Sequence, residues 1–158
     1  MNNSNNEVVI VEAIRTPIGT YKGALKDLRA DKLGTIGISE ILKRTKIDKN
    51  EIDEVIMGQV LTAGVGQNPA RQAAVNAGID ISKPAHIINQ VCGSGLRAVI
   101  SGYQSIKLGE VKSVISGGQE NMSLAPHSIF FRDNKKISEE QLVDTMISDG
   151  LILSLIHI

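Results

Sequence analysis

Runs of Val and Ile, each bounded by Gly, Pro or polar residues, predict short β-strands. The predicted strands are Val8–Ile14, Val55–Leu61, His86–Cys92 and Ser113–Ser116. Between these runs, apolar residues recur at the spacing of one helix face. The predicted helices are Ala30–Lys46, Asn68–Ala77 and Gly93–Leu108. The order βαβαβαβ has connections suited to parallel strands, so the sequence predicts an α/β layered fold.

The ends of two predicted helices carry residues typical of helix boundaries. Asn68 has the side chain of an N-cap and Pro69 occupies the first helical position. Gly78 and Gly109 follow the last residues of two helices, where a left-handed residue commonly ends the helix.

The character of the chain changes at about residue 120, which divides it into expected regions. We expect a disordered leader at 1–6, an α/β domain at 7–120 and the start of a loop or insertion region at 121–151. Within that last region, a weak periodicity predicts a short amphipathic helix over Glu139–Ile147.

Composition and charge exclude several classes of protein. The 158 residues suit about one domain, and 17 basic side chains balance 17 acidic ones. A nucleic-acid binder or a polybasic membrane module would show a basic excess. No run reaches the ~18 apolar residues of a membrane span, and the first residues lack the features of a secretory signal. We therefore expect a cytoplasmic protein that binds neither nucleic acid nor membrane.

The single cysteine lies where a strand is predicted to turn into a helix. Cys92 follows an apolar run and precedes Gly93, Ser94 and Gly95. Glycines at such a junction permit a tight turn, and the layout is similar to a nucleophile elbow with sulfur in place of oxygen. A free cysteine is more often a small buried hydrophobe. From the residues alone, the nucleophilic and structural interpretations of Cys92 have about equal weight.

A cysteine nucleophile needs a partner that the nearby sequence does not supply. A helix terminus favours the thiolate by only ~0.3–2 kcal/mol, so a base, usually histidine, is expected as well. The chain has three histidines, and for His86, His127 and His157 we favour structural or surface roles. Neither the histidines nor the lone cysteine have the spacing of metal ligands, so no metal site is predicted.

Two further segments could carry chemistry, and both have simpler interpretations. The glycines of 64–72 could cradle a phosphate, but the segment lacks the Lys-Ser/Thr of a P-loop. A turn into a helix, with Arg71 making structural or interface contacts, fits better. Glu120 follows two glycines after the fourth predicted strand. For this lone carboxylate we predict a buried hydrogen bond or a helix cap in place of catalysis.

Several blocks of the sequence together resemble the N-terminal half of a thiolase. These blocks are Glu12–Gly19, Val55–Leu61, Gly66–Ala73, Asn89–Ala98, Ser116–Ser123 and Val143–Leu151. They occur in the family's order over about residues 7–151, and the block around Cys92 is the most specific. The nearest resemblance is to the biosynthetic thiolases, which join two acetyl-CoA molecules into acetoacetyl-CoA and CoA.

The resemblance implies an acyltransferase in which Cys92 is the nucleophile and carries an acyl-thioester intermediate. It implies acyl-CoA substrates, no permanently bound cofactor, and a homodimer or homotetramer for the whole protein. No CoA-binding residue is assigned. A longer-chain 3-ketoacyl-CoA thiolase and a non-catalytic interaction fragment are the alternatives. A ketoacyl-synthase type of condensing enzyme fits the cysteine block less well.

The resemblance implies that the family's activating histidine, its second cysteine and an oxyanion asparagine lie in a second half, which we expect this chain to lack. We therefore expect the 158-residue chain to be a truncated fragment that is inactive, or nearly so, alone. We also expect residues 152–158 to be a non-native tail. Leu153–Ile158 reads like the translation of a transposase sequencing adapter.

Overall fold

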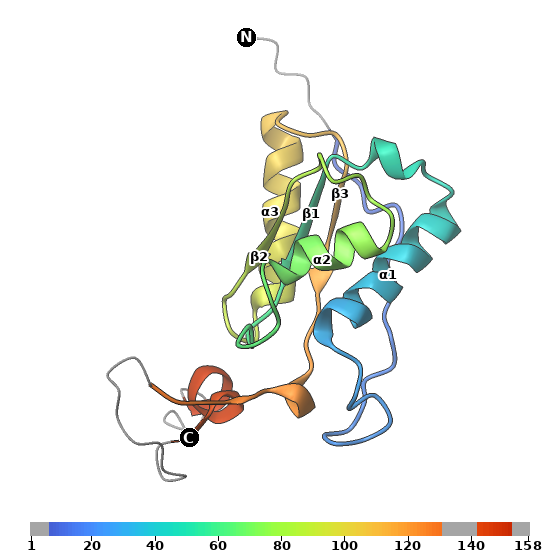
Figure 1. Ribbon diagram of the computed structural model, residues 1–158. Helices are drawn as coiled ribbons and strands as arrows, with labels where there is room; N and C mark the ends of the chain where they lie inside the picture. Colours follow the sequence, from blue (N-terminus) through green and yellow to red (C-terminus); the bar gives the residue numbers. More distant parts are fainter. Residues whose placement is uncertain (1–6, 131–141, 153–158) are drawn as a thin grey trace.

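The centre of the molecule is a three-stranded parallel sheet with the strand order β2-β1-β3. The computed structural model describes residues 7–130 and 142–152. The strands are β1 (Glu54–Gly58), β2 (Ala85–Ile88) and β3 (Val114–Gly118). The helices are α1 (Ala30–Thr45), α2 (Pro69–Asn76) and α3 (Ser94–Leu108) (Figure 1). This arrangement confirms the α/β layered fold and the parallel pairing.

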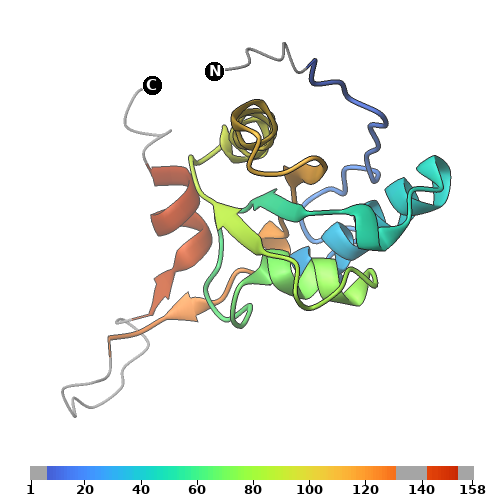
Figure 2. The same cartoon turned by 90° about the horizontal axis from the view of Figure 1, so that it is seen from above.

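Helices cover both faces of the sheet. Seen from above, α3 lies on one face and α1 and α2 lie on the other (Figure 2). The main apolar core lies between the sheet and the helices α1 and α2. It consists of Ile38, Ile52, Val55, Met57, Ala70, Ala73, Ala74, Ile79 and Ile115. An apolar side of α3 stays exposed and lines a hollow of the molecule: Leu96 is 68% exposed and Tyr103 is 49% exposed.

The predicted helix boundaries are confirmed where the sequence has capping residues. Asn68 is the N-cap of α2, and its side chain accepts the backbone N–H of Arg71 at 3.1 Å. Pro69 is the first helical residue, where its missing N–H costs no helical hydrogen bond. Gly78 follows α2 with a φ of 89°, and Gly109 ends α3 with a φ of 76°.

The predicted strand Val8–Ile14 is wrong for this structure. The segment has no regular secondary structure, and Ile10 is 79% exposed. A strand exists only where a neighbour accepts and donates its backbone hydrogen bonds. Here residues 7–14 are separated from β3 by a hollow of about 870 Å³ that they line together with β3 and α3. In the described part of the chain, β3 therefore pairs with β1 alone.

The region after β3 leaves the sheet, as the change in sequence pattern predicted. It contains a 3₁₀ turn, η2 (Met122–Leu124), and a short antiparallel pair, β4 (His127–Ser128) and β5 (Val143–Asp144). The predicted helix Glu139–Ile147 is wrong over its described residues, since β5 lies within it and a helical turn, η4, spans Met146–Leu151. The helical turn starts late because the Asp144 carboxylate accepts the Met146 N–H at 2.9 Å.

No helix within residues 7–130 and 142–152 is long and apolar enough to span a bilayer. The expected leader at 1–6 and the tail from 153 onward lie outside the described residues, as do residues 131–141.

Candidate active site

The candidate site lies where the carboxyl ends of the three parallel strands meet. In open α/β sheets this edge is the usual position of ligand and catalytic sites. Cys92 follows the end of β2 and its side chain is exposed there. Strand β2 is shorter than predicted, ending at Ile88, because residues 89–93 fold into a tight turn that leads directly into α3. The structure thus presents the thiol at a strand-to-helix turn, as the sequence indicated.

The turn before Cys92 contains a strained residue. Val91 has a φ of 48°, and a β-branched residue with a positive φ is an outlier. The left-handed conformation costs about 1–2 kcal/mol for such a residue, so surrounding contacts must hold it. The Asn89 side chain accepts the Val91 N–H at 2.9 Å, and the Ser94 N–H donates to the Val91 carbonyl at 3.0 Å.

Three glycines bring α3 close to the sheet beneath the cysteine. A Cβ placed on Gly58 of β1 would lie 2.5 Å from the backbone nitrogen of Gly95. A Cβ on Gly118 of β3 would lie 3.3 Å from the Cα of Gly95. The first turn of α3 therefore rests directly on the backbones of β1 and β3.

The backbone around Cys92 leaves one hydrogen-bond donor available. The neighbouring N–H groups are used within the turn, since Gly93 donates to the Gln90 carbonyl at 3.0 Å. No group in the described residues accepts the N–H of Cys92. A free backbone N–H beside a thiol, at the start of a 15-residue helix, can stabilise developing negative charge on a bound carbonyl oxygen.

Glu120 makes hydrogen bonds, as the sequence predicted, although they are only partly buried. Its carboxylate crosses from the end of β3 to the end of β1, where it accepts the N–H of Val60 at 2.7 Å and that of Leu61 at 3.3 Å. These bonds explain why β1 stops at Gly58 before its predicted end. Burial raises the pKa of Glu120 above 4.5, and the backbone donors oppose this shift only in part.

A pair of buried glutamines lies beside Glu120. The Gln119 side chain donates to that of Gln59 at 2.8 Å, and Gln59 in turn donates to the Leu61 carbonyl at 2.8 Å. The side-chain oxygen of Gln119, Oε1, is buried, has no hydrogen-bond partner among the described residues and faces Gly34 of α1. This pair was not predicted, because nothing in the local sequence pattern marks a glutamine at a strand end as buried.

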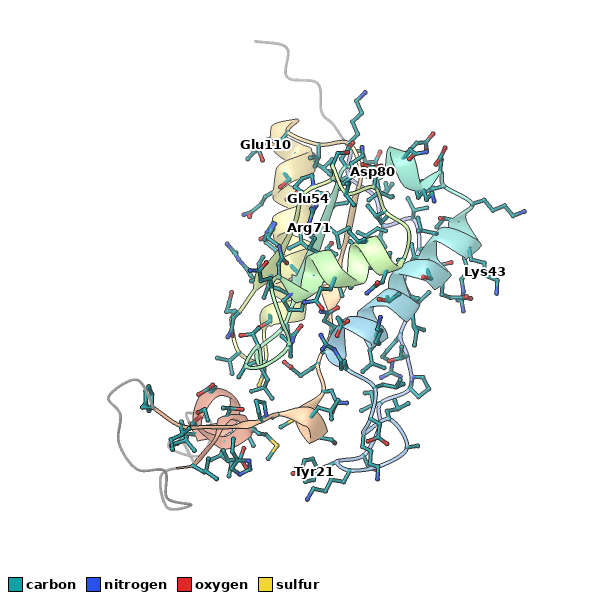
Figure 3. The ribbon with its side chains drawn as sticks, viewed as in Figure 1. Tyr21, Lys43, Glu54, Arg71, Asp80 and Glu110 are labelled. Carbon is teal, nitrogen blue, oxygen red and sulfur yellow. The ribbon has the colours of Figure 1, made fainter. Side chains whose placement is uncertain are left out.

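Each of the two described histidines lies beside a carboxylate. His86 lies on β2, and its Nδ1 is 3.3 Å from a carboxylate oxygen of Glu54, the first residue of β1 (Figure 3). In a parallel sheet this is the end opposite to the cysteine turn. The Nε2 of His127 lies 3.9 Å from Asp144. His157 is outside the described residues. Within the parts of the chain that the structure describes, no group of His, Cys, Asp and Glu could hold a metal ion.

Arg71, labelled in Figure 3, has the structural role predicted for it. Its guanidinium donates to the backbone carbonyl of Ile81 at 2.6 Å and to that of Lys83 at 3.3 Å. These bonds tie α2 to the segment that enters β2. The glycine-containing segment before α2 is thus a helix-entry turn stabilised from within the chain.

A parallel α/β sheet that presents a cysteine on a glycine-packed strand-to-helix turn defines the class of the protein: an α/β protein with an elbow-type thiol. Comparison with known proteins identifies the family. The family described as "Thiolase, N-terminal domain" matches residues 8–156, and the chain belongs to it. The resemblance noted in the sequence blocks is thereby confirmed.

Three curated relatives with this similarity are named acetyl-CoA acetyltransferases. The chain is 49% identical over 148 residues to the protein of Rhizobium meliloti, which covers 94% of this chain and 38% of the relative. It is 51% identical over 146 residues to the protein of Cupriavidus necator, which covers 92% of this chain and 37% of the relative. It is 49% identical over 151 residues to the cytosolic enzyme of Rattus norvegicus, covering 96% and 38%. The chain thus spans about 38% of the length of these relatives.

Proposed function

We propose that this chain is the nucleophile-bearing part of an acetyl-CoA C-acetyltransferase, with Cys92 as the catalytic nucleophile. The observation that carries the proposal is the geometry of Cys92: an exposed thiol next to an unused backbone N–H, on a turn packed against glycines at the carboxyl edge of the sheet. The names of the three relatives above, acetyl-CoA acetyltransferases, support the substrate class.

The proposed reaction has two steps. The Cys92 thiolate attacks the thioester carbonyl of acetyl-CoA, so that a bond from sulfur to the acetyl carbon forms, the bond to CoA breaks, and the CoA thiolate leaves and takes up a proton. A second acetyl-CoA then loses a proton from its methyl carbon and attacks the acetyl-enzyme. A carbon–carbon bond forms, the bond to Cys92 breaks, and acetoacetyl-CoA is released; the reverse reaction is thiolysis. The Cys92 N–H would donate to the carbonyl oxygen in both steps.

The bases of this reaction would come from elsewhere in the protein. His86 is paired with Glu54 at the other end of the sheet, and His127 lies beside Asp144. We therefore propose that the 158-residue chain is a fragment and does not turn over alone. The exposed apolar face of α3, with Leu96 68% exposed, supports this proposal because such a face in a complete enzyme is normally covered.

For the whole protein we further propose CoA thioesters as its substrates, no permanently bound cofactor, a homodimeric or homotetrameric assembly and a cytoplasmic location. The location is supported by the printed names of the rat and mouse relatives, which are called cytosolic. A longer-chain 3-ketoacyl-CoA thiolase is the neighbouring alternative within the family.

The exposed face of α3 also favours a second candidate, a non-catalytic fragment that uses this face to bind a partner. Acylation of the chain by acetyl-CoA distinguishes the two candidates. The purified chain is incubated with acetyl-CoA, and the adduct is located by mass spectrometry of proteolytic fragments. We expect one acetyl group on Cys92 and none in the C92A variant. Acetylation that is absent, or unchanged in C92A, contradicts the role of Cys92.

Turnover is measured separately as thiolysis of acetoacetyl-CoA by the same chain. We expect none above the uncatalysed rate, because the base that activates the attacking thiol is missing. Sustained turnover by the chain alone would show that the described residues already hold the complete machinery.

A further inference from the structure

Ser94 is the most enclosed side chain of the cysteine turn. Only 4% of its surface is exposed, although it lies two residues from the exposed Cys92. Its hydroxyl accepts the N–H of Gln90 at 2.9 Å and donates to the carbonyl of Val91 at 2.5 Å. Both partners belong to the turn, so a side chain on the first residue of α3 closes that turn from the helix side.

The carbonyl of Val91 is the critical partner, since it shares a peptide unit with the N–H of Cys92. Ser94 contacts this oxygen twice, through its hydroxyl and through its backbone N–H at 3.0 Å. A trans peptide is planar, and its N–H points away from its carbonyl. Fixing the Val91 carbonyl therefore fixes the direction of the Cys92 N–H.

The same contacts oppose a conformational preference. Val91 has a φ of 48°, and a valine released from its contacts would move to a negative φ. That movement would rotate the peptide unit between Val91 and Cys92, so that the Cys92 N–H and the Cys92 thiol would no longer face the same side. Residues held in such regions persist only when the surrounding structure determines them.

We propose that Ser94 is a positioning residue for acyl transfer at Cys92: its hydroxyl holds the peptide between Val91 and Cys92 so that the N–H and the thiol face the same acyl carbonyl. The inference rests on the proposed nucleophilic role of Cys92. It adds a residue that acts through the backbone and does not touch the substrate.

The test compares two reactions of Cys92 in the 158-residue chain. Acetylation by phenyl thioacetate passes through an oxyanion and needs no contact with CoA, whereas alkylation by iodoacetamide develops no oxyanion. We expect S94A to slow acetylation by about tenfold or more, because misdirecting one oxyanion donor removes part of the 10²–10³-fold that such a donor provides. Alkylation should change by no more than about threefold, since it lacks that stabilisation.

A rescue variant separates positioning from packing. Glycine adopts a positive φ without strain, so V91G/S94A should recover at least about threefold of the acetylation rate lost in S94A. S101A, two turns further along α3, is the matched control and should react like the wild type. Circular dichroism checks that each variant is folded. If S94A fails to fold, the acetylation rate of V91G/S94A relative to the wild type tests the inference.

Three results would overturn the inference: S94A acetylated at the wild-type rate, both reactions slowed equally in a folded S94A, or no rescue by V91G. A wild-type chain that phenyl thioacetate does not acetylate would overturn it as well. A chain that phenyl thioacetate acetylates but acetyl-CoA does not would contradict the proposed substrate and leave the role of Ser94 intact.

Discussion

Replacing Gly58 by alanine tests whether the close approach of α3 to the sheet positions Cys92. A Cβ at this site would lie 2.4 Å from the carbonyl carbon of Ser94, and ordinary contact begins at 3.4 Å, so the first turn of α3 must move by about 1.0 Å. The obstructing atoms are backbone of Ser94 and Gly95, which cannot rotate aside as a side chain can. Overpacking of this kind costs typically about 1–3 kcal/mol.

For a chain of this size, that loss lowers the melting temperature by roughly 3–10 °C. A displacement of about 1 Å at a reacting group can also cost up to about 10²-fold in rate, so acetylation of Cys92 should fall by at least about tenfold. Thermal unfolding followed by circular dichroism, together with the rate of acetylation by phenyl thioacetate, measures both effects.

The matched control is G117A on the neighbouring strand, where an added Cβ meets nothing within 4 Å. Its stability should equal or exceed that of the wild type, because alanine restricts the unfolded chain more than glycine does. A G58A variant that melts and reacts like the wild type would refute the argument that backbone contact positions the cysteine turn.

Three further predictions concern stability measured by urea unfolding. In α1, G34A should lower the free energy of unfolding by about 1–3 kcal/mol, because its Cβ would overlap the buried Gln119 side chain. G37A, with open space around it, should raise the free energy of unfolding by up to about 1 kcal/mol. Equal effects of the two changes would contradict this packing. N68A should lower the free energy of unfolding by about 1–2 kcal/mol, since it removes the N-cap of α2 at a residue with a φ of 41°. A urea midpoint equal to that of the wild type would show that the cap is dispensable. Because burial raises the pKa of Glu120 above 4.5, the folded chain holds this proton more tightly than the unfolded chain, and the stability contributed by this group falls as the pH rises through the interval above 4.5. E120Q should remove this part of the pH dependence of stability. If plots of unfolding free energy against pH run parallel for E120Q and the wild type, Glu120 does not cause it.

The local sequence predicted those features that depend on neighbouring residues. The boundaries of α2 follow from a capping asparagine and a proline at its start, Asn68 and Pro69, and Gly109 marks the end of α3. The cysteine turn was located correctly because an apolar strand, a glycine pair and an amphipathic helix follow one another directly along the chain.

Other features could not be predicted because they depend on contacts between distant segments. The pattern at Val8–Ile14 predicts a strand, but a strand forms only beside a partner, and residues 7–14 are separated from β3 by a hollow. The Gln59–Gln119 pair joins residues 60 positions apart. Neither residue carries a local signal for burial, because glutamine is usually found at the surface.

The α/β class, the helix boundaries and the strand-to-helix position of the single cysteine follow from the sequence, since these depend on periodicity and on residues close along the chain. The presentation of the cysteine depends instead on packing between distant segments. The positive φ of Val91, the two bonds from the Ser94 hydroxyl and the contact of α3 with Gly58 all arise from packing the helix onto the ends of the strands. A β-branched residue does not favour that backbone conformation locally, so its geometry is set by the contacts around it.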